Sequence, residues 1–294
     1  MRFTRTGSLI LTAIAAALFV ALELLFGRDG AFDLSGPWFS YSENGDKAII
    51  DGVFWTYLML ALVIAGGLWQ TSRIPEEGVQ LGSAGVDDTE GQIHDPKWWR
   101  LLVGNVYLAV FWLPIRFFIG RAWLAAGEHK VRDDAWMDGG TALVSGNPEA
   151  PGFWERIVAV PPDVPRPLIA YDWYRDFITY LIDNDWASFF GKAIAVGEVL
   201  VGLGLLFGAL VGIAAFFGTV MNMSFMLAGS ASSNPVLFGL TVFIILAWKV
   251  AGWLGLDRWI LPALGTPWQA GRLLGSKATL ESQTAPGTPP HKYA

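Results

Sequence analysis

One apolar stretch, from Phe189 to Asp257, limits what this chain can fold into. It is broken only by glycine-rich and small-polar turns and contains three apolar runs, at about 189–209, 211–228 and 235–254. Each is long enough to cross a bilayer core of about 30 Å at a rise of about 1.5 Å per residue. Because a segment inside lipid must satisfy its own backbone hydrogen bonds, the stretch predicts three membrane-spanning helices.

The composition supports a membrane protein. The chain is 53% hydrophobic and only 16% charged, with a mean hydropathy of +0.42. It contains 15 Trp and 34 Gly, which suits aromatic belts at the lipid interface and close helix contacts. The net charge of −6 argues against a nucleic-acid partner, since binding phosphates requires a basic face. The lipid bilayer is therefore the expected surrounding of an all-α polytopic protein.

Three more spans are predicted before this stretch, at 7–26, 52–70 and about 101–126, which makes about six in all. The first run lacks a good A-x-A cleavage site, which favours a membrane anchor over a cleaved signal peptide. An even number of spans puts both termini on one side. With the termini in the cytoplasm, nine Lys or Arg lie inside and eight outside, six of those in the long region 121–190, which the positive-inside rule discounts.

The region 128–188 is predicted to be a long extracytoplasmic loop that ends in an amphipathic helix. Apolar side chains recur at helical spacing along one face, and polar ones along the other. The apolar positions are Trp173, Tyr174, Phe177, Ile178, Leu181 and Ile182. This pattern is typical of a helix lying in the membrane interface. The alternative is a small extramembrane helix that packs on the loop.

Residue types exclude several kinds of redox centre. The chain has no cysteine, which rules out disulfides, thiolate catalysis and Cys-bound iron–sulfur clusters. None of its three histidines, His94, His129 and His291, lies inside an apolar run, so a bis-histidine haem is not expected. There is no dinucleotide fingerprint that would indicate a flavin. His94 beside Asp95 reads as a solvated pair, and no metal site is predicted.

Charged and polar residues inside the apolar runs mark a candidate site, because a charge in hydrocarbon is costly. The rise per residue places Arg116, Glu198 and Asn222 in the outer half of the bundle, with Glu23 near the outer end of the first span. Lys249 lies nearer the inner face. Arg116 and Glu198 are expected to pair across adjacent helices.

Two interpretations of that pair stay open. The first is a packing ion pair that fixes the bundle. The second is a pocket in which Arg116, with Arg121 and Lys130, attracts an anion or holds a quinone carbonyl, while Glu198 relays protons. Asn222 makes an interhelical hydrogen bond or contacts substrate, and His129 is a surface residue or a proton entry point.

Three motifs carry a family resemblance. The pattern R-x3-G-x2-W-x3-G-x2-K runs from Arg116 to Lys130, G-E-x3-G-x-G runs from Gly197 to Gly204, and G-x2-G-L-D runs from Gly252 to Asp257. With these motifs the chain resembles the DoxX family of bacterial and archaeal membrane proteins and the related DoxD subunit of thiosulfate:quinone oxidoreductase. The resemblance implies a four-helix membrane bundle over about residues 100–262, a bacterial or archaeal cytoplasmic membrane, and redox work near quinone.

We therefore expect two N-terminal spans in residues 1–98, a DoxX-like bundle in 99–262 and a disordered cytoplasmic tail in 263–294. The expected function is a membrane component of a redox system that transfers electrons from thiosulfate or another sulfur compound to quinone at the outer side. Glu198 and Arg116 are the candidate catalytic residues, and the candidate substrate-binding residues are Arg121, Lys130, Asn222 and His129. The alternative is a non-catalytic subunit that scaffolds a larger membrane complex or a homo-oligomer; a small-solute transporter is a third.

Overall fold

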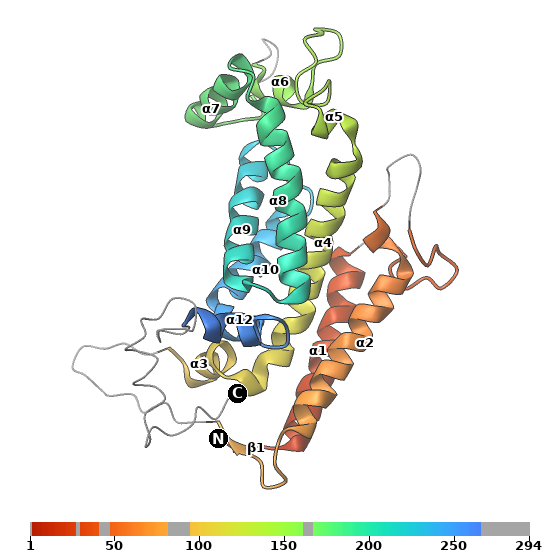
Figure 1. Ribbon diagram of the computed structural model, residues 1–294, viewed down its shortest axis with the longest axis vertical. Coiled ribbons are helices and arrows are strands. Elements are labelled where there is room, and N and C mark those ends of the chain that lie inside the picture. Colours follow the sequence, from red (N-terminus) through yellow and green to blue (C-terminus); the bar gives the residue numbers. More distant parts are fainter. Residues whose placement is uncertain (1, 28–29, 41–47, 82–94, 161–166, 266–294) are drawn as a thin grey trace, which may run out of the picture.

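A computed structural model describes residues 2–27, 30–40, 48–81, 95–160 and 167–265. The described chain is mostly helical, as predicted, and Figure 1 shows its helices running mostly along one long axis. A two-stranded antiparallel sheet pairs Arg2 with Gln80 and Phe3 with Val79. The elements in order are β1 (Arg2–Phe3), α1 (Arg5–Phe26), η1 (Ile49–Asp51), α2 (Val53–Ser72), β2 (Val79–Gln80), α3 (Lys97–Gly104), η2 (Val106–Phe111), α4 (Trp112–Arg132), α5 (Asp134–Met137), α6 (Phe153–Val158), α7 (Asp172–Asp183), α8 (Ala187–Phe207), α9 (Val211–Leu227), α10 (Asn234–Leu246), α11 (Trp248–Ala251) and α12 (Asp257–Leu264).

Four helical segments of the described chain are long and apolar enough to cross a membrane: α1, α2, η2 with α4, and α8. Two further apolar helices are shorter, α9 with 17 residues and α10 with 13. These helices fit a multi-pass membrane protein, whereas only four of the six predicted spans reach full length. The tail beyond residue 265 and residues 82–94, which include His94, lie outside the described residues.

The third span begins later than predicted. Asn105 adopts an extended backbone, with φ −117° and ψ 118°, and its side chain accepts a hydrogen bond from the Tyr107 amide. This ends α3 at Gly104, so the continuous α-helix starts at Trp112 and extends to Arg132, past the predicted end at 126. The shift of the helix start changes the depth of every charged residue on α4.

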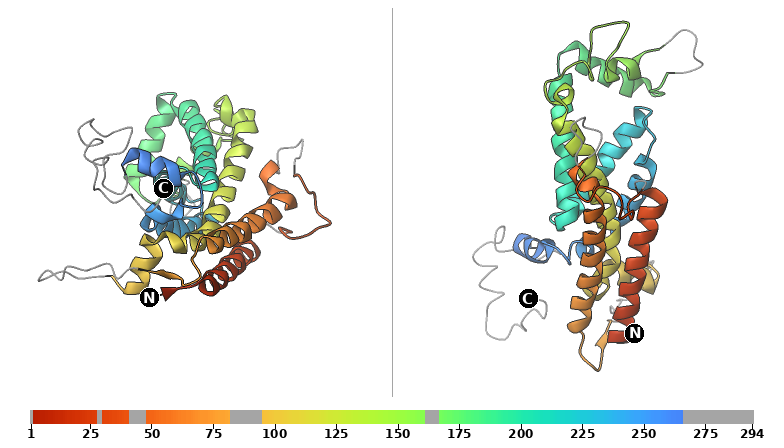
Figure 2. Two further views of the ribbon diagram at one scale, coloured as in Figure 1. Left: turned by 60° about the horizontal axis from the view of Figure 1, so that its bottom comes forward. Right: turned by 90° about the vertical axis from the view of Figure 1, so that its right-hand side faces the viewer.

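Helix α4 is the centre of the fold. In the most apolar stretch of η2 and α4, 78% of the residues are buried inside the protein. The corresponding stretches of α1, α2 and α8 are only 28–33% buried. Its neighbours include α8, α1 and α10. Figures 1 and 2 show α1 and α2 as a hairpin along one side of α4, with α8, α9 and α10 on the other side. The start of α1 and helix α12 lie at the same end, and α5, α6 and α7 form a cap at the opposite end.

The predicted amphipathic helix exists as α7, but its buried face is narrower than expected. Tyr174, Ile178 and Leu181 are buried in a cap core with α6, whereas Trp173 and Phe177 are 62% and 42% exposed. The helix packs against α6 in the cap, and its placement in the membrane interface stays a prediction. Nearby, Glu155 accepts hydrogen bonds from the amides of Gly152, Ser145 and Gly146, and these bonds, that of Gly152 foremost, lower the pKa of its carboxyl.

A carboxylate fixes the tight turn between α8 and α9. Gly208 and Leu210 have positive φ values of 66° and 48°, which leaves the first amides of α9 pointing away from their own helix. The carboxylate of Asp257 accepts from the Leu210 amide at 2.6 Å and from the Val211 amide at 2.9 Å. Asp257 is 1% exposed, so the family-like G-x2-G-L-D motif ends in a buried helix cap.

Replacing Asp257 with alanine is expected to lower the free energy of unfolding by about 1–3 kcal/mol, because two buried amides lose a charged acceptor. Asp257→Asn keeps one acceptor oxygen and should lose less. Thermal unfolding of the purified protein in detergent micelles measures the difference, with Asp176→Ala on the exposed side of α7 as the control. Equal midpoints for Asp257→Ala and the control would show that the turn does not need this cap.

Candidate functional site

Helix α4 carries three cations at three heights: Arg116 and Arg121, which are buried, and Lys130, which is partly buried. Arg116 is 1% exposed, Arg121 is 6% exposed, and the Lys130 side chain is 20% exposed. Each charge must find compensating groups, since water is excluded from the interior of the bundle. The three cations are compensated in three different ways.

Arg116 donates its hydrogen bonds to backbone carbonyls, while its charge is attracted by the carboxylate of Asp257. Its Nη1 donates to the Ala251 carbonyl at 2.9 Å and its Nη2 to the Leu254 carbonyl at 3.0 Å. The guanidinium also lies against Gly208 and Gly255, where a Cβ atom would collide with the chain around it. These glycines therefore allow the backbone to close around the cation.

The expected Arg116–Glu198 pair is wrong. Arg116 is only one turn from the start of α4, at the same end of the molecule as α12. The prediction counted depth from residue 101, whereas the continuous helix begins at Trp112. Arg116 thus belongs to the end at which the chain starts, and Glu198 belongs to the half nearer the cap.

Glu198 pairs with Lys130. The Lys130 ammonium donates to both carboxylate oxygens of Glu198, at 3.0 and 2.8 Å, and Glu198 is 1% exposed. The same ammonium lies over the rings of Trp136 and Phe225, at 5.3 and 5.8 Å from their centroids. Two aromatic faces and a bidentate contact hold this cation in place.

Glycines bring α4 and α8 close enough for that pair to form. A Cβ atom on Gly127 would lie 2.6 Å from the Val199 amide nitrogen, and one on Gly202 would lie 2.5 Å from the Leu124 amide nitrogen. The backbones of the two helices are therefore in near contact. The glycines of the first two family-like motifs thus act in packing, as small residues do between membrane helices.

Two buried polar groups beside the pair have no hydrogen-bond partner among the described residues. Asn222 on α9 is 0% exposed, and both its Oδ1 and its Nδ2 are unpaired. Trp123 on α4 is 2% exposed, with its Nε1 also unpaired. Phe225, one turn after Asn222, contacts Trp123 with ring centroids 6.2 Å apart. The predicted interhelical hydrogen bond of Asn222 is not formed with any described residue.

Arg121 holds the N-terminal hairpin onto α4. Its Nη1 donates to Glu23 Oε2 at 3.1 Å and to Thr56 Oγ1 at 2.6 Å. Its Nε donates to the Ile50 carbonyl at 3.1 Å and its Nη2 to the Asp51 carbonyl at 3.3 Å. The donors of this guanidinium are thus directed at the protein itself rather than at a substrate anion.

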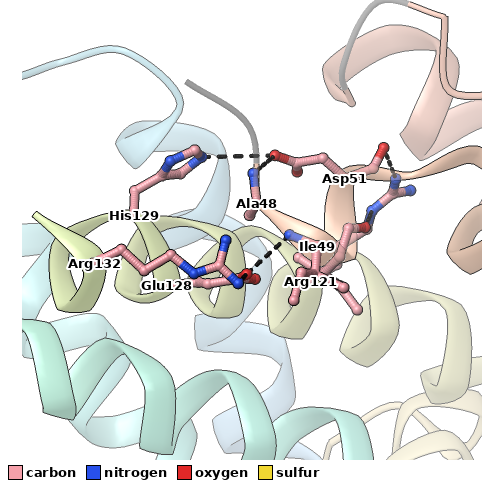
Figure 3. Close-up of polar contacts among 8 residues, drawn as sticks. Ala48, Ile49, Asp51, Arg121, Glu128, His129 and Arg132 are labelled. Atoms are coloured by element: carbon pink, nitrogen blue, oxygen red, sulfur yellow. Dashed lines mark hydrogen bonds and ion pairs between the residues drawn. The ribbon is translucent and has the colours of Figure 1, made fainter. Parts of the chain in front are cut away.

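Two neighbouring residues of α4 extend this attachment to η1, as Figure 3 shows. His129 Nε2 lies 3.6 Å from Asp51 Oδ2, and Asp51 Oδ2 also accepts from the Ala48 amide at 2.8 Å. Glu128 accepts from the Ile49 amide at 2.9 Å and forms an ion pair with Arg132. His129 thus lies at a contact between elements. We refer to the contacts of Arg121, Glu128 and His129 with Glu23 and residues 48–56 as the η1 clamp.

A groove of about 630 Å³ opens along the side of the bundle between α2, α4 and α8. Its charged end comes from Glu128 and Arg132. Its other lining residues are apolar: Ile49, Ile50, Trp55, Leu58, Met59, Leu62, Phe117, Leu124, Val131, Val199, Leu203, Leu206 and Phe207. The volume of the groove is in the range of sites that bind drug-sized ligands. Nothing in the sequence pattern indicated it, because it depends on how far α2 stands from α4 and α8.

The predicted site residues thus fall into three places. Glu198 and Lys130 are paired, with Asn222 close by on α9; Arg121 and His129 belong to the η1 clamp; Arg116 lies at the opposite end. Glu23, Asp51, Thr56 and Glu128 are polar partners whose pairing the sequence did not predict. Within the described part of the chain, no three His, Asp or Glu side chains gather as a metal site would require.

Comparison with protein-family models, with curated proteins and with solved structures finds no match to this chain. The resemblance to the DoxX family therefore rests on the three motifs quoted above. The structure gives these motifs physical roles in helix packing, cation burial and capping, and these roles hold whatever the family.

The Lys130–Glu198 pair can be tested by a double-mutant cycle. Glu198→Met or Lys130→Met alone leaves one buried charge without its partner, and each should lower the free energy of unfolding. The double variant should recover about 2–3 kcal/mol of the summed loss, with allowance for the partly exposed ammonium. Unfolding in detergent micelles measures all four proteins. Strictly additive losses would show that the two groups do not interact.

Proposed function

We propose that this protein is a membrane-embedded component of a quinone-linked redox system, and that quinone binds in the groove between α2, α4 and α8. The observation that supports this best is the groove itself, about 630 Å³ with apolar walls and a charged pair at one end. Apolar walls with a charged end suit an amphiphilic ligand that has an isoprenoid tail and a polar ring. The groove opens on the side of the bundle, from which a lipid-soluble ligand enters.

The charged end suits a quinone ring. Arg132 is a guanidinium with several N–H donors, and it can donate to a ring carbonyl when Glu128, its partner in the structure, is protonated. Reduction of a quinone to a quinol takes two electrons and two protons, so a carboxyl group close to the ring is the appropriate kind of proton donor. Glu128 lines the groove and occupies that position.

Glu198 lies directly behind the groove wall. Its neighbour Val199 lines the groove, while the Glu198 carboxylate points to Lys130 on α4. In this proposal the Lys130–Glu198 pair stores a proton that replaces the one passed from Glu128 to the ring. Arg116 takes no part, because it binds main-chain carbonyls at the far end of α4.

The electrons are proposed to come from a sulfur compound, in keeping with the family resemblance. Two thiosulfate ions that join through a new S–S bond to form tetrathionate release two electrons and no protons. The two electrons balance the reduction of one quinone, and the two protons of the quinol come from water by way of the protein carboxyl groups. A partner subunit that carries a redox centre could deliver the same two electrons. The expected site of this reaction is the outer side of the membrane.

A second candidate is a non-catalytic subunit that scaffolds a larger complex. Lys130 and Glu198 satisfy each other with two short contacts, as a pair that serves only packing would. The outer face of α9 also exposes a row of large apolar side chains, which another membrane subunit or lipid would cover: Ile213, Phe216, Phe217, Val220 and Met223. In this case the groove would hold an ordinary lipid tail.

Filling the groove tests the proposed function. Leu203→Trp places an indole in the groove, whereas Leu200→Trp adds the same volume at an α8 position that is 63% exposed and outside the groove. Leu203→Trp is expected to weaken binding of a short-chain quinone about tenfold or more, as loss of a buried contact surface predicts. Binding is followed in detergent micelles by quenching of tryptophan fluorescence, and the Leu200→Trp protein should bind as the parent does.

The catalytic part is tested with the same proteins. Thiosulfate-dependent reduction of the quinone should be present in the parent and in Leu200→Trp and should be lost in Leu203→Trp. Quinone binding without reduction would favour a binding subunit that receives its electrons from a partner. Equal binding by both variants would mean that quinone does not use the groove.

A further inference from the structure

A second cleft lies between α1, α4 and the start of α10, away from the quinone groove. It has a volume of about 300 Å³. Its polar lining comes from Glu23 on α1, Asp51 on η1, Arg121 on α4 and Ser233 just before α10. Apolar side chains that include Phe26 and Phe118 complete it. The proposed quinone function uses none of this space.

One carboxylate oxygen in this cleft lacks a partner. Glu23 is 3% exposed, and its Oε2 accepts from Arg121 at 3.1 Å. Its Oε1 is buried and makes no hydrogen bond to any residue that the structure describes. A buried carboxylate oxygen without a donor is costly. Because Glu23 lines the cleft, a ligand there that supplies a hydrogen-bond donor would remove this cost.

The charges around the cleft specify the sign of that ligand. Glu23 and Asp51 bring two negative charges and Arg121 brings one positive charge. The Arg121 donors are directed at Glu23, Thr56 and the η1 carbonyls, so they are not turned to the cleft. His129 approaches Asp51 at 3.6 Å from its own position on α4. Glu23, Asp51 and Arg121 together carry one net negative charge, so the cleft favours a hydrogen-bond donor that carries one positive charge.

We propose that this cleft binds a primary ammonium group. An ammonium has three N–H donors and no acceptor, which suits the unpaired Glu23 oxygen together with the Ser233 hydroxyl. The ring of Phe118 in the same lining suits a cation held against an aromatic face. A quaternary ammonium has the same charge without N–H donors and cannot satisfy the Glu23 oxygen.

The ammonium could come from a lipid or from solution. Glu23 and Phe26 lie in the last turn of α1, and Ser233 directly precedes α10, so the cleft is beside the ends of these two helices, where lipid headgroups lie. A phosphatidylethanolamine headgroup and a free alkylamine present the same chemistry at this position. The experiment separates the two sources.

Three proteins are compared in the test. Glu23→Gln removes the charge of the carboxylate whose Oε1 lacks a partner among the described residues. Because it also weakens the contact with Arg121, Ala126→Phe provides a second variant that fills the cleft and leaves the Glu23–Arg121 pair in place. Ala17→Phe, at an exposed position of α1, is the matched control for added volume.

The free-amine arm titrates each full-length protein in micelles with ethanolamine hydrochloride, and with tetramethylammonium chloride at equal ionic strength, and follows the midpoint of thermal unfolding. The lipid arm uses native mass spectrometry of protein from nanodiscs that contain phosphatidylethanolamine and phosphatidylcholine in equal amounts. Ethanolamine alone should raise the midpoint saturably, or phosphatidylethanolamine should be retained about tenfold over phosphatidylcholine, as a charge-assisted hydrogen bond predicts.

Both effects should disappear in Glu23→Gln and Ala126→Phe and persist in Ala17→Phe. A response to ethanolamine without lipid selection assigns the site to a soluble amine, and lipid selection alone assigns it to a headgroup. Neither response in the parent protein would overturn the proposal. An equal response to tetramethylammonium, or a response that survives Ala126→Phe, would also overturn it.

Discussion

The fold depends on how α4 buries its cations. A charged side chain inside a bilayer is tolerated only when charges or oriented dipoles replace its water. Arg116 finds the carbonyls of Ala251 and Leu254, Arg121 finds Glu23 with Thr56 and the η1 carbonyls, and Lys130 finds Glu198. Because each set of partners comes from a different part of the chain, α4 joins the C-terminal helices, the N-terminal hairpin and α8 into one structure.

The groove follows from the same arrangement. The η1 clamp attaches the N-terminal hairpin to α4 near one end of α2, through Arg121, Glu128 and His129. On the other side, the motif glycines let α8 approach α4 at backbone distance. The side chains of α2 therefore form one wall of a groove whose other walls are α4 and α8, and its polar end coincides with the clamp. In this account the groove is a product of the clamp and of close α4–α8 packing.

The sequence indicated the helical membrane fold because long apolar runs allow few other structures. It also indicated that Glu198 would be paired, since a lone carboxylate in that position is too costly. It gave the wrong partner, because the depth of Arg116 depended on a helix start that Asn105 moves by several residues. The partner that the structure shows, Lys130, is the last residue of the first family-like motif and lies at the other end of α4.

Other features could not be predicted because they arise between segments that are distant in sequence. The pairing of Glu23 with Arg121 requires α1 to lie against α4, and no local pattern encodes that choice. The predicted buried face of α7 included too many residues. Helical spacing alone does not distinguish Tyr174, which packs in the cap, from Trp173, which is exposed. The unpaired amide of Asn222 likewise becomes visible only when its neighbours on α4 and α8 are in place.

The most direct test of this account is where a quinone binds. Photolabelling of the full-length protein in nanodiscs with an aryl-azide quinone, followed by mass spectrometry of the peptides, locates the bound ring and tail. The account predicts labels on groove residues of α2 and α8, such as Met59 and Leu203, that excess unlabelled quinone suppresses. Labels confined to the exposed faces of α9 and α10, or labels that excess quinone does not suppress, would contradict it.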